Sequence, residues 1–289
     1  MMTMEVFEVK PHGYCQGVMD AIKLALKAKE ENPDRTCFLL GGIVHNEDTI
    51  KFFEERGFII LNEKKASLDV LISSIPDGEV VIFSAHGHAK SLEDIAKKKH
   101  LIIYDATCPF VTANMRLASS KHQRNIVYVG VKGHLEAEGF LANVKTAGFY
   151  DTDKAHFEAY KENIIAPLVI GQTTLSKKEF DDAYAFISRN YPGSEAGLSR
   201  CRSTTDRQEA LRDAAREGGT VIVLGSKTSN NTRKLYEIGI EEGRTTYLVL
   251  GLDELKTIPL EKERRIVLCS GASTSKNTFD ECLDYLKSI

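Results

Sequence analysis

Short apolar runs alternate with amphipathic stretches along the whole chain. The runs are rich in β-branched residues, and polar loops follow them. One of the stretches between them keeps an apolar face at helical spacing, with Val18, Ala21, Ile22 and Ala25 on one side. This alternation predicts an α/β fold with mostly parallel strands. The expected strands are Thr36–Leu40, Val80–Phe83, Leu101–Tyr104, Ile126–Val129, Leu168–Ile170, Val221–Leu224, Tyr247–Leu250 and Arg265–Leu268.

Three cysteines divide the chain evenly, because 93 residues separate Cys15 from Cys108 and another 93 separate Cys108 from Cys201. Each cysteine is followed by two units in which a strand runs into a polar loop. In chain order these units are GGIVHN, VIFSAHG, VYVGVKGH, LVIGQTT, VIVLGSKTSNN and IVLCSGAS. Three similar thirds predict a pseudo-threefold arrangement of α/β domains, with boundaries at residues 1–107, 108–200 and 201–289.

Each of the three evenly spaced cysteines stands just before an expected helix. Pro109 follows Cys108 and suits the first position of a helix. Beyond Cys201, Thr205 to Gln208 have the pattern of a capping box, and Gly218 and Gly219 are expected to end that helix. The N-terminus of a helix favours negative charge, so all three positions favour the thiolate, which is the form that binds metal.

A free cysteine is often only a small buried hydrophobe, and we expect this of Cys37 and Cys282. Cys269 ends a strand but has no counterpart in the other thirds. Cys15, Cys108 and Cys201 share a context and an equal spacing, which favours a role as metal ligands over a role as buried hydrophobes. The absence of a CxxC pair argues against a zinc ribbon or a ferredoxin-type run. Three thiolates suit a cubane cluster in which one iron has no protein ligand and is open to a substrate oxygen.

Composition narrows the class of protein further. The hydrophobic content of 42% and charged content of 27% are ordinary for a globular protein, and the net charge of -3 argues against binding nucleic acid through a broad basic field. The longest apolar runs are too short to cross a membrane, and the N-terminus lacks the pattern of a secretory signal. We therefore expect a cytoplasmic protein, in which six cysteines indicate metal binding or reactive thiols rather than disulfides.

The polar loops are expected at the carboxyl ends of the strands, where open α/β sheets bind ligands. They offer imidazoles, hydroxyls and amides beside helix N-termini, which together suit an anion such as a diphosphate. Three histidines holding a metal ion are the alternative, which would leave the Ser, Thr and Asn side chains unexplained. The candidates are His45, His86, His134, Ser229, Asn231 and Ser273.

Glu136, in GHLEAEG, is the candidate acid. A carboxyl group enclosed beside an anionic ligand has a raised pKa and can deliver a proton. A solvated glutamate at a helix start is the alternative. Thr173, in GQTT, is expected to position Glu136 or a water molecule, although it or Thr174 would equally serve to cap a helix from Ser176.

Taken together, these motifs resemble the family of 4-hydroxy-3-methylbut-2-enyl diphosphate reductases, known as IspH or LytB. The resemblance covers nearly the whole chain, and the ordered set of motifs is far more specific than any one of them. The motifs are PHGYCQGV, GGIVHN, SAHG, DATCP, GHLEAEG, GQTT, CRSTTDRQEA, GSKTSNNT and SGAS.

The resemblance implies a trefoil of three α/β domains around one 4Fe–4S cluster with a substrate-accessible iron. Cys15, Cys108 and Cys201 would hold the cluster, while Glu136 and Thr173 would serve the proton transfer. The implied reaction uses two electrons and two protons to remove the allylic hydroxyl as water, giving isopentenyl and dimethylallyl diphosphate. Ferredoxin or flavodoxin would supply the electrons, because the sequence has no nucleotide-binding fingerprint. The residues that would hold the diphosphate are His45, His86, His134, Ser229, Asn230, Asn231 and Ser273.

The chain departs from the family pattern at Leu135 and Ser275, where proline is usual, and at Asn230, where serine is common. These changes bear on substrate geometry more than on cluster binding. A paralogue acting on another small phosphorylated alcohol therefore remains an alternative. A cluster-dependent hydro-lyase, which also uses an open iron but needs no net electrons, is another. A redox sensor that binds a metabolite is a third, although no DNA-binding element supports a transcriptional role.

Overall fold

The computed structural model describes residues 4–62, 65–121, 123–197, 201–260 and 263–289. These residues form two compact units. The terminal unit comprises Met1–Gln16, His45–Thr49 and Arg202–Ile289, and the middle unit comprises Gly17–Val44 and Ile50–Cys201. No helix of the described residues is both long and apolar enough to span a lipid bilayer.

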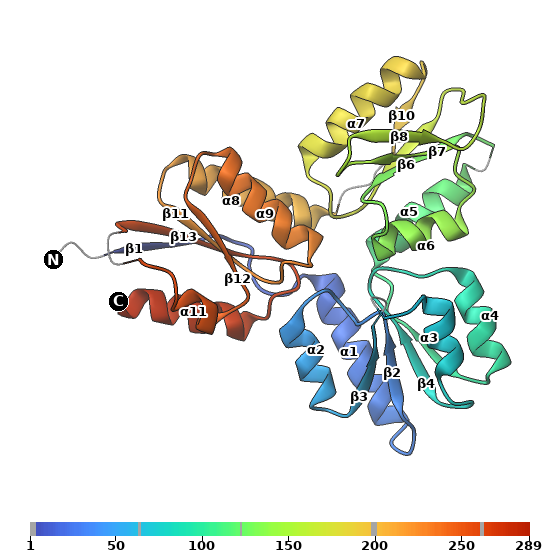
Figure 1. The fold of residues 1–289 in the computed structure, drawn as a ribbon, viewed down its shortest axis with the longest axis horizontal. Helices are drawn as coiled ribbons and strands as arrows, with labels where there is room; N and C mark the ends of the chain where they lie inside the picture. Colours follow the sequence, from blue (N-terminus) through green and yellow to red (C-terminus); the bar gives the residue numbers. More distant parts are fainter. Residues whose placement is uncertain (1–3, 63–64, 122, 198–200, 261–262) are drawn as a thin grey trace. The chain divides into compact units, whose positions relative to one another are not determined.

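The terminal unit is built on one parallel sheet of four strands, in the order β1-β13-β11-β12. The strands are β1 (Glu5–Glu8), β13 (Arg265–Ser270), β11 (Thr220–Leu224) and β12 (Thr246–Val249). Its helices are α8 (Arg202–Arg216), α9 (Asn230–Glu241), α10 (Leu252–Leu255) and α11 (Lys276–Ser288). The helices cover both faces of the sheet, with α8 and α9 on one face and α11 on the other (Figure 1).

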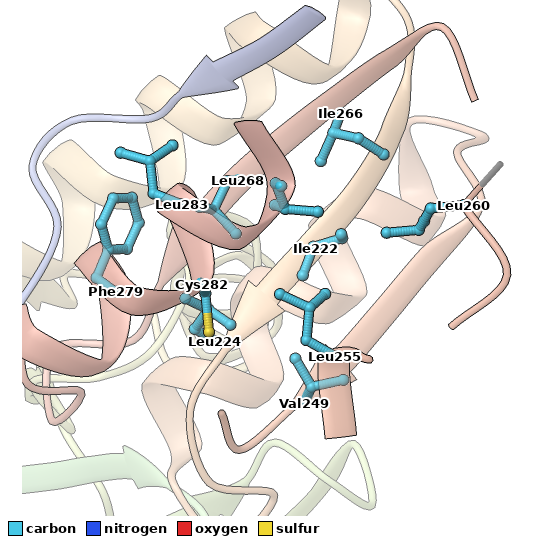
Figure 2. Close-up of a cluster of buried hydrophobic side chains, with 11 residues drawn as sticks. Ile222, Leu224, Val249, Leu255, Leu260, Ile266, Leu268, Phe279, Cys282 and Leu283 are labelled. Atoms are coloured by element: carbon cyan, nitrogen blue, oxygen red, sulfur yellow. The ribbon is translucent and has the colours of Figure 1, made fainter. Parts of the chain in front are cut away.

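Side chains along each strand of this sheet alternate between two cores. Val221 and Val223 pack with Leu211 of α8 and Leu235 of α9. Ile222 and Leu224 point to the opposite face. There they meet side chains of β12, α10, the loop after α10, β13 and α11 (Figure 2), which are Val249, Leu255, Leu260, Ile266, Leu268, Phe279, Cys282, Leu283 and Leu286. Burial on both faces explains why these strands read as continuous apolar runs in the sequence.

The middle unit contains two further sheets. The first has the strand order β3-β2-β4-β5 and is entirely parallel. Its strands are β3 (Phe58–Leu61), β2 (Cys37–Leu40), β4 (Val80–Phe83) and β5 (Ile102–Asp105). The helices that precede or connect the strands are α1 (Gln16–Glu31), α2 (Glu47–Glu54), α3 (Leu68–Ser74) and α4 (Lys90–Lys98). Phe38, Leu40, Val81 and Phe83 pack against α3 and α4 on one face.

The second sheet of the middle unit has the order β10-β9-β6-β7-β8, and only the β7–β8 pair is antiparallel among its pairs. Its strands are β10 (Glu195–Ala196), β9 (Leu168–Gly171), β6 (Ile126–Gly130), β7 (Gly148–Asp151) and β8 (His156–Ala159). Helix α7 (Lys177–Asn190) covers one face, while α5 (Pro109–Ser120) and α6 (Leu135–Asn143) cover the other.

The predicted α/β fold class with mostly parallel sheets is confirmed. Each of the eight strands expected from the sequence is present, and β4 has the predicted bounds of Val80–Phe83. The N-terminal strand differs from the predicted division at residues 1–107, because β1 pairs with β13 of the last third. There it closes an edge of the sheet that β13 would otherwise leave open, and Val6 packs onto the core of that sheet. The three domain boundaries stay a prediction.

Candidate active site

All three evenly spaced cysteines immediately precede a helix. Helix α1 begins at Gln16, α5 at Pro109 and α8 at Arg202, so each cysteine lies at the amino end of its helix. The three side chains are partly exposed, whereas Cys37, Cys269 and Cys282 are buried. Burial raises the pKa of the Cys282 thiol to about 12 and also raises the pKa of Cys37 and Cys269. The buried thiols are thus kept protonated, as expected of residues that only fill space.

The main-chain N–H groups of the three cysteines are bound in the same way. Each donates to a carbonyl oxygen in the polar loop that follows the strand paired, in the same sheet, with the strand before the cysteine. Cys15 donates to Ala272 after β13 (3.0 Å), and Cys108 donates to Ala85 after β4 (3.0 Å). Cys201 donates to Thr173 after β9 (3.3 Å). The threefold repeat seen in the spacing therefore recurs in the hydrogen bonds that position the cysteines.

Gly17, one residue into α1, leaves room for the sulfur of Cys108. A Cβ atom built on Gly17 would lie 2.8 Å from Cys108 Sγ, which is closer than real Cβ contacts come. Any side chain at residue 17 would therefore push the thiol aside. The glycine of the motif CQG is explained by this approach, since its backbone needs no special conformation.

Arg207 organises the loop before Cys15, and sequence reasoning did not single it out. The guanidinium is buried and donates to the main-chain carbonyls of Pro11 (2.9 Å), Gly13 (2.8 Å) and Ser270 (3.4 Å). The spacing of Thr204, Arg207 and Leu211 along one buried face of α8 indicates that Arg207 is buried, but not which groups it binds. A buried arginine that binds three carbonyls ties the Cys15 loop to the end of β13.

Glu136 is a buried carboxyl group near the amino end of α6, and Thr173 holds both of its oxygens. The Thr173 N–H donates to Oε1 (2.7 Å), and the Thr173 hydroxyl donates to Oε2 (2.8 Å). The carbonyl of the same threonine accepts the N–H of Cys201. One residue thus connects the candidate acid to a candidate cluster ligand within the middle unit.

Burial raises the pKa of Glu136 from its ordinary 4.5 to about 7, and the donors on Thr173 and Tyr128 oppose that rise. Desolvation disfavours the charged carboxylate, so the loss of water outweighs three hydrogen bonds. A carboxyl group with this pKa is partly protonated at neutral pH, as a general acid must be. The alternative of a solvated helix-start glutamate is wrong for Glu136, which is 3% exposed.

Tyr128 of β6 is a second residue that sequence reasoning did not single out. Its ring is fully buried and stacks on Phe140, and its hydroxyl lies 3.5 Å from Glu136 Oε1. Burial and the nearby Glu136 raise the pKa of the phenol, which therefore stays a donor. Its strand-like pattern in the sequence carried no hint of this contact, because the acid lies eight residues further on, in the next helix.

Two capping expectations need correction. The helix after Cys201 begins at Arg202, so Thr205 to Gln208 lie inside α8 and form no capping box at its start. The same residue pattern fits a helix interior, where Gln208 faces the core. Helix α7 is capped by Ser176, whose Oγ accepts the Glu179 N–H while the Glu179 carboxylate accepts the Ser176 N–H. Thr173 is therefore not needed as a cap.

The histidines of the middle unit, His86 and His134, lie together. Their ring centroids are 5.6 Å apart, with the planes at 81°. His134 is also the N-cap of α6, because its Nδ1 accepts the Glu136 N–H (3.1 Å). This bond leaves Nε2 as the donor nitrogen when the ring is neutral, which suits an anionic ligand.

The candidates of the terminal unit meet around the loop after β13. Asn231 Oδ1 accepts the Ala272 N–H (3.0 Å), and Ser273 Oγ lies 3.5 Å from the carbonyl of His45. Ser229 caps α9 by accepting the Thr232 N–H (3.4 Å). The Asn231 amide nitrogen is buried without a hydrogen-bond partner among the residues that the structure describes. An unsatisfied buried donor of this kind indicates a missing acceptor.

The three departures from the family pattern have local roles. Leu135 is the first residue of α6, which forms without proline because His134 caps it. Asn230 is buried, and its Oδ1 accepts from Arg233 Nη2 (3.0 Å). Ser275 caps α11 by accepting the Thr278 N–H (3.0 Å), a role that proline has no side-chain acceptor to fill.

Comparison with known proteins finds relatives that match nearly the whole chain. The sequence profile of the LytB protein matches residues 6–287. A 4-hydroxy-3-methylbut-2-enyl diphosphate reductase of Bacillus pumilus is 34% identical over 288 residues, covering 98% of this chain and 91% of that protein. The reductase of Bacillus subtilis is 33% identical over 291 residues, with 98% and 90% covered.

A solved structure is similar to this chain in its fold as well as in its sequence. The reductase of (E)-1-hydroxy-2-methylbut-2-enyl 4-diphosphate from Plasmodium falciparum superimposes with a TM-score of 0.80 at 26% identity, covering 98% of this chain and 88% of that one. The match to the family extends over nearly all of the chain, and the relatives are similar over nearly their full lengths. The chain therefore belongs to the LytB protein family.

Proposed function

We propose that this chain is an iron–sulfur oxidoreductase that converts 4-hydroxy-3-methylbut-2-enyl diphosphate to isopentenyl and dimethylallyl diphosphate. The reaction breaks the allylic C–O bond, consumes two electrons and two protons, and releases the oxygen as water. The observation that carries the proposal is the chain of contacts from Glu136 through Thr173 to Cys201. It sets an acid with a pKa of about 7 beside a candidate cluster ligand.

The residues present fit a 4Fe–4S cluster held by Cys15, Cys108 and Cys201. All three are partly exposed at helix N-termini, and Gly17 leaves space around the Cys108 sulfur. Gly17 follows Cys15 by two residues, so chain geometry keeps their Cα atoms within about 7 Å. A cluster held by these three thiolates would pass electrons to the substrate and would offer a Lewis-acidic iron without a protein ligand.

Glu136 and Thr173 are proposed to supply the proton. In the protonated acid, the Oε2–H group donates to Thr173 Oγ1, 2.8 Å away, and the threonine hydroxyl can then donate onward to the leaving oxygen. Protonation turns a poor leaving group, hydroxide, into water. The buried position of Glu136 keeps bulk water from setting its protonation state.

The diphosphate is proposed to bind the neutral donors of both units. His86 and His134 form one pair, and Asn231 offers an amide whose donors lack partners among the described residues. The other proposed contacts are His45, Ser229, Asn230 and Ser273. The pseudo-threefold placement of three α/β domains around the cluster belongs to this proposal.

A reduced ferredoxin or flavodoxin is the proposed electron donor, because the sequence has no nucleotide-binding fingerprint from which to take electrons directly. A cluster held by thiolates also requires a reducing compartment. We therefore place the enzyme in the cytoplasm.

Anaerobically purified protein should be brown and should oxidise a reduced viologen dye when the hydroxylated diphosphate is added. The Cys108→Ser variant should lose iron and this activity, whereas Cys37→Ala, which removes a fully buried thiol, should keep both. Glu136→Gln should keep the iron but lose turnover.

Two outcomes would overturn the proposal. Substrate turnover without any reductant would instead indicate a cluster-dependent hydro-lyase. A protein with a full complement of iron that leaves the dye reduced would indicate either a paralogue with another phosphorylated alcohol as substrate or a sensor. Retention of the response in Glu136→Gln would distinguish the sensor.

A further inference from the structure

The last residue of α6 binds the start of a helix from the other sheet of the middle unit. Asn143 Oδ1 accepts the main-chain N–H of Lys90 (2.8 Å), and Asn143 Nδ2 donates to the carbonyl of His88 (2.7 Å). The same amide group donates to the carbonyl of Gly139 in its own helix (2.9 Å). One side chain thus satisfies both a donor and an acceptor of segment 84–90.

These contacts replace the cap that α4 lacks. Its N-cap residue is Ala89, which makes no side-chain hydrogen bond to the first turn. The first N–H groups of a helix have no partners within the helix, so an acceptor from elsewhere stabilises that end. Asn143 supplies this acceptor from α6.

Gly139 lets α6 lie directly on the same segment. A Cβ atom on Gly139 would lie 3.1 Å from the His88 nitrogen and 3.3 Å from the Gly87 carbonyl carbon. Residues 139 and 143 are one helical turn apart and therefore share a face of α6. Helix α6 therefore contacts segment 84–90 at two successive turns, through Gly139 and through Asn143.

The two elements joined in this way both carry proposed anion-binding residues. Helix α6 begins just after His134 and contains Glu136, while segment 84–90 contains His86. The His86 and His134 rings face each other edge to face at 5.6 Å. Because a nine-residue helix is a rigid rod of about 13 Å, a contact at its C-terminal end determines where its N-terminal end lies.

We propose that Asn143 is a positioning residue, which holds α6 in register with segment 84–90 so that His86 and His134 form a preformed subsite for a phosphate group. The inference rests on the proposed function for the identity of the ligand, a diphosphate. Asn143 itself touches neither the ligand nor the acid. Substitution of Asn143 retains every proposed binding residue, but α6 and segment 84–90 are then free to move apart.

The test measures binding of inorganic diphosphate to the anaerobically purified holoenzyme by titration calorimetry. Asn143→Ala should bind diphosphate about fivefold to twentyfold more weakly, as expected when two hydrogen bonds that preorganise a site are lost. Gly139→Ala should weaken binding in the same direction, although alanine has the higher helix propensity. In turnover, both variants should show a raised KM with a smaller change in kcat.

Asn190→Ala is the matched control. Asn190 is the last residue of α7 and donates to the carbonyl four residues before it (2.8 Å), as Asn143 does, but within the described part of the chain its side chain bonds to no other element. Asn190→Ala should lower the melting temperature, because it loses the same bond within its own helix as Asn143→Ala does. It should leave the affinity for diphosphate unchanged.

Unchanged affinity in Asn143→Ala and Gly139→Ala, with binding by the unmutated protein, would overturn the inference and leave the proposed function intact. Equal weakening in Asn190→Ala would also overturn it, because helix-end stability alone would then explain the effect. A protein that binds no diphosphate at all would remove both the subsite and the proposed substrate class.

Discussion

Replacing Glu136 with glutamine should change how the stability of the protein depends on pH. The side chain is 3% exposed, and its pKa lies near 7 instead of 4.5 because the folded state withholds water from it. Glutamine has the same shape and can still accept the Thr173 N–H, but it does not titrate. The comparison therefore isolates the ionisation of one buried group.

The size of the effect follows from the two pKa values. A group whose pKa is raised by folding contributes stability that is fully present below its unfolded value and is lost as the pH rises through its folded value. For Glu136 this window runs from pH 4.5 to about pH 7. The rise corresponds to about 3 kcal/mol, at about 1.4 kcal/mol for each pKa unit.

The assay is urea unfolding of the anaerobically purified proteins at a series of pH values, with the difference in unfolding free energy taken between the two chains. Because both chains release the cluster on unfolding, its contribution cancels in the difference. The unmutated protein should lose about 3 kcal/mol relative to Glu136→Gln between pH 4.5 and 7, and the difference should then level off. Glu138→Gln, from the exposed side of the same helix, controls for the loss of one acidic side chain.

A difference that stays constant across this range would refute the reasoning. It would mean that Glu136 is ionised at neutral pH in the folded protein, and the proposed acid would have no proton to give.

Three further substitutions test other parts of the site. Gly17→Ala should lower the iron bound per chain, because the new Cβ would lie 2.8 Å from Cys108 Sγ. The control Gly251→Ala should keep its iron, because its new Cβ would make only an ordinary contact of 3.4 Å. Equal iron contents in the two variants would contradict this reasoning. Thr173→Val should keep the visible absorption of the cluster but lower turnover about tenfold to a hundredfold, the value of a hydrogen bond to a charged group, and full activity would exclude the relay. Tyr128→Phe removes a donor to the Glu136 carboxylate, so the pKa of Glu136 should rise and the alkaline limb of the pH–rate profile should move to higher pH. The control Tyr150→Phe, in the neighbouring strand, should leave this limb in place. A shift in both variants would count against the contact between Tyr128 and Glu136.

The fold was accessible from the sequence where burial on two faces makes a strand continuously apolar. Val80–Phe83 was predicted residue for residue, because every one of its side chains is buried. The strand Glu5–Glu8 was not foreseen, since it has a glutamate at each end, exposes Phe7, and has as its partner β13, which lies about 260 residues later in the chain. The local pattern of apolar and polar residues carries no information on the pairing of two strands so far apart in the sequence.

The candidate site was foreseen in its residue types rather than in its contacts. Thr173 and Glu136 were expected to lie together, and the two hydrogen bonds between them agree with that expectation. The start of α8 was misplaced because a pattern of threonine and glutamine fits both a capping box and a helix interior. Comparison with the starts of α1 and α5, directly after their cysteines, would have corrected it.

Arg207, Tyr128 and Asn143 illustrate what a sequence does not reveal. Each acts through main-chain atoms or a carboxyl group on another element. Main-chain partners leave no trace in residue identity, and contacts between elements depend on packing angles that periodicity does not encode. Such positioning residues need coordinates to be found.

The central claim is that three thiolates hold one cluster and leave an iron free for the substrate. Mössbauer spectroscopy of protein enriched in ⁵⁷Fe, recorded before and after addition of the hydroxylated diphosphate, tests it most directly. We predict four iron sites, of which a single one changes its isomer shift and quadrupole splitting when the ligand binds. Four sites that all stay unchanged, or iron that is bound singly rather than in a cluster, would contradict the account.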